Sequence, residues 1–503
     1  MLEMKKLVIV GGGSSGWMAA AMLSKTLGNQ VQITVIESTS IASVGVGEAS
    51  IPPLTSFNQA LGLNQQAFMT ATKASIKLGI QFEGWNTPTD NYIHAFGDIG
   101  RPLGLMGFHH AWLKQQQSSS TFWDYSFNAM AAKAGRFGFS HTNSATNTSN
   151  PIADLTHAYH FDAIEYANVL KQFCLKQGVK HLIATVNKVE LCKNNTNIQR
   201  LILDSQQIID GDIFIDCSGF KSLLLSEALN TEFIDWSDLL PCDRAWAVPC
   251  ENDANTSISP YTRSIAHKGG WQWQIPLQHR SGNGMVFSSR FWSEEQALEC
   301  LLANLPGKSL AEPKLIRFKT GRRAKQWQGN CIALGLASGF LEPLESTSIH
   351  LVQSGILRLI KLFPQSNDFA ALRQEFNRQS AREFEQIRDF LVLHYHLNRR
   401  EEPLWQYCQK MPIPPELQRR IDLFKACGHV EREQHELFAE PAWLQVMLGQ
   451  GIQPTLHHPI ANGINLNDLN RYLLDLQQLI NARVVQLPTH QQFLAQYCPA
   501  NSH

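Results

Sequence analysis

The sequence carries little charge and no excess of either sign. Among its 503 residues, Lys and Arg number 43, Asp and Glu also number 43, and charged residues make up only 17%. Proteins that bind nucleic-acid phosphates or anionic membranes need a surplus of positive charge. The composition therefore argues against both kinds of partner.

Long apolar runs and paired cysteines are also missing. The residues before Gly11 contain too short an apolar stretch for a signal peptide or a spanning helix, so we expect a cytoplasmic protein. The 10 Cys include no Cys-x-x-Cys pair, a pattern typical of buried thiols, and we expect neither disulfides nor a metal. A hydrophobic content of 44% and 12 Trp predict a globular protein with a large core and enough aromatics for a lined cavity.

A glycine-rich turn near the N-terminus predicts a dinucleotide site. An apolar strand over residues 6–10 leads into Gly11-x-Gly13-x-x-Gly16, a helical stretch follows, and a second strand ends at Glu37. Glycines let the backbone approach a pyrophosphate at the helix N-terminus, and the acidic residue accepts hydrogen bonds from ribose hydroxyls. The alternative is a tight turn without a ligand.

Two later segments extend this fold and favour FAD over NAD. The apolar strand starting at Ile213 ends in Asp216 and Gly219, as does the strand that returns beside the first βαβ unit in two-dinucleotide flavoproteins. The alternative is an ordinary core strand. A further strand reaches Gly335, and a turn of small residues follows it, with Ser338 and Gly339.

These segments predict an α/β protein with an FAD-binding, doubly wound, Rossmann-like domain. We expect one composite domain over residues 1–365, with flavin segments at about 1–85, 155–225 and 312–365 and an inserted β-rich layer. Residues 366–503 have apolar positions at helical spacing, which predicts a helical substrate-side region.

A helix is expected from about Ser348. Its first free N–H groups, around Thr347 and Ser348, suit a small anion beside the flavin. An ordinary Ser/Thr N-cap explains the same residues equally well.

Two segments alternate with period two. In Gly270–Pro276, Trp271, Trp273 and Ile275 share one face, which predicts a half-buried strand with an aromatic wall. In residues 74–85, Lys77 faces away from the apolar side chains, so the pattern alone predicts a solvated lysine.

Taken together, four motifs resemble the flavin-dependent tryptophan halogenases. They are the glycine fingerprint, Val44-Gly-Val-Gly-Glu-Ala49, the Gly-Trp-x-Trp-x-Ile-Pro run, and Phe340-Leu-Glu-Pro-Leu-Glu-Ser-Thr-Ser348. The resemblance extends over most of residues 1–365. It implies that Lys77, in a Lys-x-x-Ile-x-Phe-x-x-Trp setting, is the essential lysine, and that Glu345 is the catalytic glutamate.

The resemblance also implies the chemistry. Reduced FAD, oxygen and chloride or bromide would give hypohalous acid, which travels through a tunnel to Lys77. There it is either hydrogen-bonded by the ammonium or transfers its halogen to the amine, and both alternatives stay open. Glu345 would polarise the halogenating agent or take the ring proton, help typically worth about 10² to 10⁴ in rate.

Other residues receive roles from the same resemblance. Thr347 and Ser348 would hold the halide through their N–H groups. Trp271 and Trp273 would separate flavin from substrate and suppress monooxygenation. The full set expected at the cofactor is Gly11, Gly13, Gly16, Glu37, Val46, Gly47, Glu48, Ala49, Asp216, Gly219, Gly335, Ser338 and Gly339, and that expected along the tunnel is Trp271, Trp273, Ile275 and Pro276.

The resemblance implies that the substrate is an indole or a tryptophan-like aromatic. His94-Ala-Phe96-Gly resembles the family's His-Pro-Phe-Gly loop, so His94 and Phe96 are expected at the substrate. Trp443 either lines that cavity or belongs to a helical core. The tyrosine pair that holds the amino-acid group of free tryptophan is not found here.

A separate flavin reductase is the expected partner, because no second dinucleotide fingerprint of comparable quality occurs. The oligomeric state is open, with a homodimer as one arrangement. Two other functions remain: a flavin-dependent aromatic monooxygenase or flavin reductase, and a flavin-binding partner protein without catalysis.

Overall fold

Three separated stretches of the chain build each of two structural units. Unit 1 contains Met1–Ala74, Phe161–Ser237 and Ile316–Gln386, and unit 2 contains Ser75–His160, Asp238–Leu315 and Ile387–His503. The structure, a computed structural model, describes residues 4–38, 48–115, 120–139, 153–194, 196–253, 255–365 and 369–500. Val46 and Gly47, both expected at the cofactor, lie outside the described residues.

Unit 1 contains the predicted doubly wound sheet. Its six strands have the order β20-β21-β12-β1-β2-β8, and β12 lies parallel beside β1 with Asp216 opposite Val10, as the sequence predicts. Helix α1 packs against α6 and α8 and is buried from Gly16 to Ser24, because nearly all of these residues are apolar or small. The sheet elements are β1 (Lys5–Val10), β2 (Val31–Glu37), β8 (Lys180–Ile183), β12 (Ile213–Asp216), β20 (Trp327–Gln328) and β21 (Cys331–Ala333).

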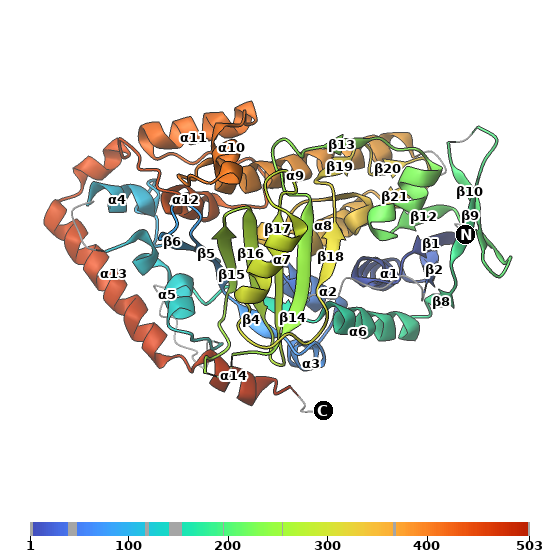
Figure 1. The fold of residues 1–503 in the computed structure, drawn as a ribbon, viewed down its shortest axis with the longest axis horizontal. Coiled ribbons are helices and arrows are strands. Elements are labelled where there is room, and N and C mark those ends of the chain that lie inside the picture. Colours follow the sequence, from blue (N-terminus) through green and yellow to red (C-terminus); the bar gives the residue numbers. More distant parts are fainter. Residues whose placement is uncertain are drawn as a thin grey trace. The chain divides into compact units, whose positions relative to one another are not determined.

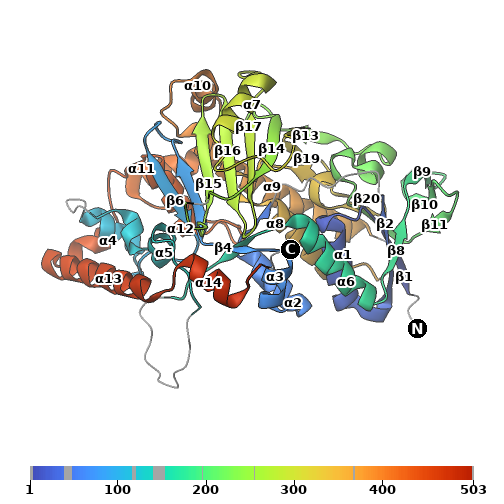
Figure 2. The same ribbon diagram turned by 60° about the horizontal axis from the view of Figure 1, so that its bottom comes forward.

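The other elements of unit 1 surround this sheet or extend from it. One antiparallel ribbon has the order β11-β10-β9 and can be followed in Figure 2, and a second small sheet has the order β13-β19-β22. The strands are β3 (Glu48–Ala49), β9 (Val186–Leu191), β10 (Ile198–Leu203), β11 (Ile208–Asp210), β13 (Phe233–Asp235), β19 (Gly321–Arg323) and β22 (Gly339–Phe340). The helices are α1 (Ser14–Leu27), α2 (Pro53–Leu61), α3 (Gln65–Ala71), α6 (Ala163–Lys176) and α8 (Ser348–Lys361), with short helical turns at η1 (Gly28–Gln30), η3 (Gly219–Lys221), η4 (Leu223–Ala228), η5 (Gly335–Ala337) and η6 (Pro343–Glu345).

Unit 2 is built on a large, mostly antiparallel sheet. Six of its strands follow the order β14-β17-β16-β15-β5-β6, and Figure 1 shows β14 to β17 with α7 alongside. Strand β4 pairs with β7 in a separate antiparallel pair. The strands are β4 (Ser75–Lys77), β5 (Gly79–Glu83), β6 (Asn91–Ala95), β7 (Ala158–Phe161), β14 (Arg244–Cys250), β15 (Thr262–His267), β16 (Gly270–Pro276) and β17 (Ser281–Phe287).

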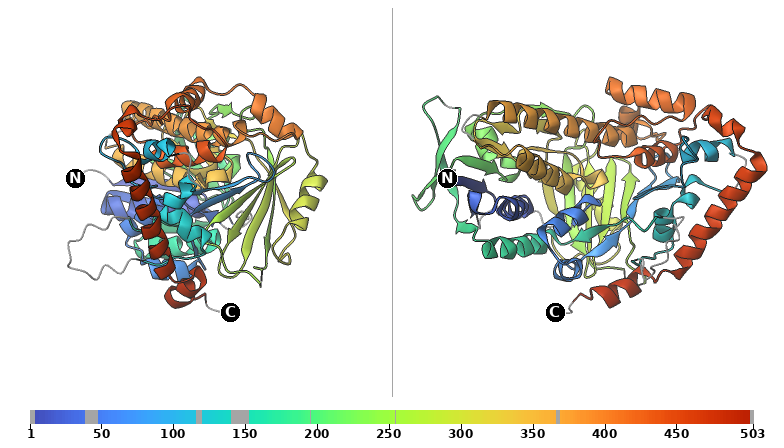
Figure 3. Two further views of the ribbon diagram at one scale, coloured as in Figure 1. Left: turned by 90° about the vertical axis from the view of Figure 1, so that its left-hand side faces the viewer. Right: turned by 180° about the vertical axis from the view of Figure 1, so that it is seen from behind.

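The C-terminal part of unit 2 is helical, as predicted. Figure 3 shows α13 as its long helix, and α9 (Ala370–His396) carries the chain from unit 1 into unit 2, as β18 (Lys314–Arg317) carries it from unit 2 into unit 1. The remaining helices are α4 (Phe108–Lys114), α5 (Phe127–Lys133), α7 (Glu294–Ala303), α10 (Pro403–Lys410), α11 (Pro415–Cys427), α12 (Glu440–Gly449), α13 (Leu466–Gln486) and α14 (His490–Tyr497), with short turns at η2 (Phe122–Tyr125) and η7 (Pro459–Gly463). No helix of the described residues is long and apolar enough to cross a membrane.

Candidate active site

The glycine turn of unit 1 leaves open space at the start of α1. A Cβ atom on Gly16 would lie 1.9 Å from the carbonyl oxygen of Gly11, whereas a Cβ on Gly13 would meet nothing within 4 Å. Gly13 is the N-cap of α1, and no side chain caps that end of the helix. Backbone N–H groups at a helix start with open space before them fit a dinucleotide pyrophosphate. The cradle therefore fits the FAD that the sequence predicts.

Glu37 lies beside this turn, at the end of β2. A Cβ on Gly12 would lie 2.3 Å from its carboxyl carbon, so glycine makes the close approach possible. Its Oε2 is 2.7 Å from Nε2 of His181 and accepts a hydrogen bond from Nζ of Lys171 at 3.3 Å. These two partners hold the carboxylate in place. The sequence did not predict them, because both lie far along the chain from the glycine motif.

The strand that favours FAD ends in a turn organised by Asp216. One carboxylate oxygen accepts from the N–H and hydroxyl of Ser218, and the other accepts from the N–H groups of Leu224 and Leu225. The carboxylate therefore organises the turn, and a contact of Asp216 with the cofactor stays a prediction. Gly219 follows with φ 74°, a left-handed conformation that favours glycine.

A second glycine turn approaches α1. A Cβ on Gly335 would lie 2.4 Å from Oγ of Ser15, in the first turn of α1. The hydroxyl of Ser338 donates to the carbonyl oxygen of Gly335 at 2.7 Å, and Gly339 begins β22. The segments around residues 11 and 335, far apart in sequence, thus meet at the same end of α1, as a dinucleotide site requires.

Glu48 and Ala49, also expected at the cofactor, form the short strand β3. Burial, and then the charge of Asp162, raise the pKa of Glu48 to about 7. A carboxyl with such a pKa can hold or release a proton near neutral pH.

Glu345 and Thr347 lie in a tight bend before α8. Ser346 has φ 56°, and α8 begins at Ser348, where the sequence predicts it. Glu345 is 1% exposed and Thr347 is fully buried. The side chain of Thr347 makes no cap, and its hydroxyl has no hydrogen-bond partner among the described residues. The ordinary N-cap interpretation of Thr347 is therefore wrong, which leaves the helix start available to a small anion.

Lys77 in unit 2 is fully buried, so the solvated lysine predicted from alternation alone is wrong. It ends β4 and is paired with Ala158 of β7, whose small side chain leaves room for it. Its Nζ lies 5.5 Å from the ring centroid of Phe96. Fully buried lysines are rare because desolvating an ammonium group is costly, and they are frequent at sites of chemistry.

The two tryptophans of β16 form part of an aromatic layer. Trp271 is 6.2 Å from Trp273 and 6.1 Å from Trp85 between ring centroids. Trp273 lies across Gly284 of β17, where a Cβ would be 2.0 Å from its ring. This close approach, which the sequence does not reveal, lets a large ring lie flat against the neighbouring strand.

The other face of β16 is covered as well. Gln272 and Gln274 both donate to the carbonyl oxygen of Asn304, next to α7, at 3.2 and 3.1 Å. The expectation of a half-buried strand is therefore wrong, because α7 packs on the glutamine face. Ile275 is buried and Pro276, the last residue of the strand, is partly buried.

His94 and Phe96 lie together at the end of β6, close to Lys77. The ring of His94 packs against Phe390 and Phe438, at centroid distances of 5.7 and 6.3 Å. Phe390 and Phe438 stack on one another at 3.8 Å. These two phenylalanines were not identified from the sequence, because helical spacing alone does not separate a cavity wall from a core.

Trp443 on α12 is fully buried, which favours the core alternative. Its ring meets Phe390 edge to face at 4.9 Å, and the guanidinium of Arg420 lies 4.7 Å from its centroid. Arg420 in turn donates to the buried carboxylate of Glu436. Buried aromatic and ionic contacts of this kind fix a helix in place.

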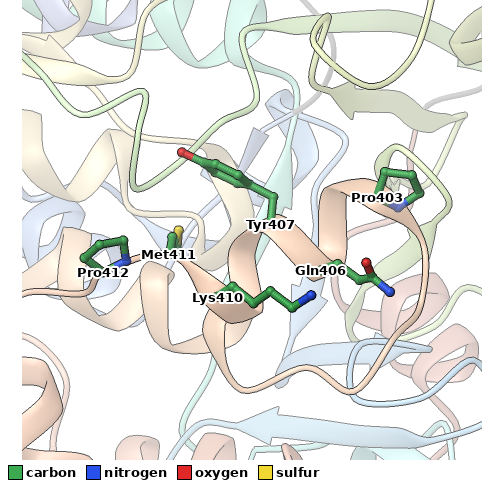
Figure 4. Close-up of a pocket in the computed structure, with 6 residues that line it drawn as sticks. All are labelled: Pro403, Gln406, Tyr407, Lys410, Met411 and Pro412. Atoms are coloured by element: carbon green, nitrogen blue, oxygen red, sulfur yellow. The ribbon is translucent and has the colours of Figure 1, made fainter.

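A pocket of about 480 Å³ lies elsewhere on unit 2. Figure 4 shows that its lining comes from α10 and the residues that follow it: Pro403, Gln406, Tyr407, Lys410, Met411 and Pro412. None of the expected site residues lines it, so we do not place the active site there. In the described part of the chain, no group of three or more His, Cys, Asp or Glu is arranged to hold a metal ion.

A dinucleotide cradle in one unit and a buried lysine beside aromatic rings in the other define a class of flavin-dependent enzyme. Residues 6–465 match the family model for tryptophan halogenase. The sequence is 32% identical over 491 residues to tryptophan 7-halogenase RebH of Lentzea aerocolonigenes, covering 91% of each chain.

Solved structures agree with the sequence comparison. The fold matches Xcc4156, a flavin-dependent halogenase from Xanthomonas campestris, with a TM-score of 0.95 and 43% identity over 99% of both chains. It matches BrvH, a flavin-dependent halogenase from Brevundimonas sp. BAL3, with a TM-score of 0.93 and 42% identity over 99% of this chain and 100% of that one.

The chain belongs to the tryptophan halogenase family and is a flavin-dependent halogenase. Membership implies FAD as the cofactor, an aromatic substrate and a separate flavin reductase.

Proposed function

We propose that this halogenase uses FADH2, oxygen and chloride or bromide to make hypohalous acid, and delivers it through a tunnel to Lys77 for electrophilic halogenation of an indole or tryptophan-like aromatic. The observation that carries this proposal is the complete burial of Lys77 beside the ring of Phe96. FAD, when bound and reduced, supplies the reaction of oxygen with halide.

Unit 1 would hold the cofactor and the halide. The open helix start at Gly13 would take the pyrophosphate, and Glu37 would take the ribose. The halide would lie at the N–H groups of Thr347 and Ser348, where the buried, unpartnered hydroxyl of Thr347 offers a further donor. An anion taken out of water needs such donors, because burial without them is costly.

Unit 2 would carry the transfer to the substrate. The ammonium of Lys77 can donate a hydrogen bond to the oxygen of hypohalous acid, or its amine can take the halogen and release water. Either way the electrophilic halogen is held at one position, which is the source of selectivity in an oriented reaction. Phe96 and His94 would guide the arene to that position.

Glu345 and the tryptophans would complete the reaction. The buried carboxylate of Glu345 would polarise the halogenating agent or accept the proton that the ring loses after halogen addition. Trp271 and Trp273 would exclude the aromatic substrate from the flavin, so that the small oxidant passes and ring oxygenation is suppressed.

The substrate class is proposed more broadly than free tryptophan. RebH is named for tryptophan. In this chain Trp443 packs against Phe390 and Arg420, and the sequence shows no tyrosine pair for an amino-acid group. An indole without the amino-acid group is therefore included among the expected substrates. A homodimer is the assembly included in this proposal.

The test is a substrate panel. The protein is incubated with a flavin reductase, NADH, FAD and either chloride or bromide, together with indoles and tryptophan, and the products are measured by mass. Halogenated product that requires halide is the expected result. Oxygenated product without halide would instead favour a monooxygenase, and flavin binding without any product would favour a non-catalytic partner protein.

A further inference from the structure

A chain of hydrogen bonds runs through the strand that carries Lys77. His160 on β7 lies opposite Ser75 on β4, with Nδ1 3.0 Å from Oγ of Ser75. Its Nε2 lies 2.9 Å from Oγ1 of Thr262 on β15. The hydroxyl of Ser75 donates to the carbonyl oxygen of Pro276, the last residue of the tryptophan strand β16. The hydrogen bonds of His160 and Ser75 thus link four strands of unit 2: β4, β7, β15 and β16.

The direction of each hydrogen bond follows from the donors available. Ser75 has one hydroxyl proton, and the carbonyl of Pro276 can only accept it. Ser75 must therefore accept from Nδ1–H of His160. Burial holds the pKa of His160 well below its usual range, so the ring is neutral and its Nε2 accepts from the hydroxyl of Thr262. The imidazole is thus held as a single tautomer.

A second buried histidine supports the same strand. Nε2 of His490 accepts from the N–H of Ile76 at 3.1 Å, and its Nδ1 donates to the carbonyl oxygen of Ile258 at 2.8 Å. His490 is therefore neutral as well. The two residues before Lys77 in β4, Ser75 and Ile76, are thus held by side chains from distant parts of the chain.

The register places His160 beside Lys77. Because Ser75 pairs with His160 and Lys77 pairs with Ala158, these four side chains share one face of the β4–β7 pair. Lys77 and His160 are diagonal neighbours, a relation that typically spans about 7–8 Å. Burial, and then the charges of Lys77 and His490, hold the pKa of His160 well below its usual range. The imidazole therefore places no second positive charge beside Lys77.

We propose that His160 is a positioning residue for Lys77, holding its strand to the tryptophan strand through the chain Thr262, His160, Ser75 and Pro276. This inference rests on the proposed function of Lys77. A neutral imidazole that makes two hydrogen bonds holds strand β4 in place. It adds no charge that would compete with Lys77 for the oxidant. Without it, the amine moves relative to the arene, and a misplacement of about 1 Å can lower a rate about 100-fold.

The test separates oxidant production from oxidant use. For each variant, hypohalous acid is measured with a trapping diketone in the absence of substrate, and halogenated indole is measured by mass in its presence. His160→Leu is expected to make oxidant as the wild type does and to lower product per oxidant formed about 10- to 100-fold. His160→Asn, whose amide can still donate to Ser75, is expected to retain more of this ratio than His160→Leu.

Two further variants keep the test decisive. Thr262→Val has nearly the same shape and removes only the donor to Nε2, so it is expected to lower the ratio several-fold if His160→Leu does not fold. His157→Gln changes a partly buried histidine of the same segment and is the control, with an unchanged ratio expected. Equal losses of oxidant and product in His160→Leu and Thr262→Val, with the ratio preserved, would overturn the positioning role.

A measurement without turnover distinguishes this inference from the proposed function. In protein labelled with ¹⁵N-histidine, the signal lost in His160→Asn is expected to be a neutral Nδ1–H imidazole that does not titrate between about pH 5 and 9. A cationic ring or the Nε2–H tautomer would contradict the inference. Absence of halogenated product from the wild type would contradict the proposed function and leave the tautomer result standing on its own.

Discussion

The two units hold their functional groups by different means. Unit 1 forms its cradle from backbone: glycines that allow close approach, a helix start without a cap, and a left-handed turn before α8. Unit 2 relies on buried polar and aromatic side chains, with Lys77 next to Phe96 and His160 bonded on both nitrogens. A short sequence motif is thus enough to form a site for a large cofactor, whereas the position of one amine depends on several strands that are distant in the sequence.

The largest effect is expected in unit 2, from Lys77→Met. Methionine fills a similar volume in the buried site but can neither donate to hypohalous acid nor take its halogen. We expect halogenated product to fall about 10²- to 10⁴-fold, the usual range for loss of a positioned polar group. FAD affinity, measured by fluorescence titration, is expected to stay unchanged. A product rate within twofold of wild type would remove Lys77 from the mechanism.

The next largest effect is expected from alanine substitutions at two glycines of unit 1, which should differ in their consequences. A Cβ on Gly16 overlaps the carbonyl of Gly11, so Gly16→Ala is expected to destabilise the protein and to abolish tight FAD binding. Gly13→Ala meets no protein atom and is expected to leave thermal stability unchanged while weakening FAD about 100-fold, because the methyl enters the space for the pyrophosphate. Unweakened FAD binding by Gly13→Ala would show that the open space serves another purpose.

Acidification is expected to affect unit 2 before unit 1. Burial lowers the pKa of His109 to about 3 and that of His490 to about 4, and in each case it outweighs a backbone hydrogen bond that raises the pKa. Both folded-state values lie below the unfolded value, so unfolding takes up protons as the pH falls from about 6.5 toward 4, and stability is lost across this window. At about pH 5.5 each histidine lowers the free energy of unfolding by about 1.4 kcal/mol, a factor of about ten.

Unit 1 supplies the contrast for this titration. Burial alone would raise the pKa of Glu383, but the hydrogen bond and charge of His350 and the charge of Arg358 bring it to about 2. This carboxylate therefore stabilises unit 1 until far lower pH. Hydrogen exchange at about pH 7.5 and 5.5, corrected for intrinsic rates, should show loss of protection in unit 2 peptides first. An equal loss of protection in both units at the same pH would contradict the expected difference between them.

The smallest effect is expected from Thr347→Val in unit 1. Valine has the shape of threonine and removes a buried hydroxyl that has no partner among the described residues. An unpaired buried hydroxyl is unfavourable, so thermal unfolding should show a gain of about 1 kcal/mol. The KM for halide is expected to rise several-fold if this hydroxyl faces the anion. A more stable variant with unchanged halide dependence would place the halide elsewhere.

The glycine turn of unit 1 could be predicted from the sequence because its constraints are local. Gly11, Gly16 and Glu37 act within one βαβ unit, and each is required by the backbone or by the end of a strand. Asp216 shows the limit of such local prediction, since its carboxylate closes a turn with Leu224 and Leu225, and the sequence did not reveal these contacts. The type of residue at the end of a strand does not reveal which groups will form hydrogen bonds with it in the folded chain.

The site of unit 2 could be predicted only through the family resemblance. Alternation predicted that Lys77 is solvated, because nothing in residues 74–85 shows that this strand pairs with β7 or that the side chain becomes buried. The same pattern left the glutamine face of β16 open, and α7 with Asn304 covers it. His160 gave no signal at all, since its two hydrogen-bond partners come from strands that only the folded chain brings together.

The central claim is that the flavin chemistry makes the oxidant and Lys77 directs it to the arene. It is tested most directly by measuring trapped hypohalous acid and halogenated indole side by side in the wild type and in Lys77→Met. The account predicts both signals in the wild type, and in the variant a normal yield of trapped oxidant with almost no halogenated indole. Halogenated indole at the wild-type rate in Lys77→Met, or no oxidant from the wild type, would contradict it.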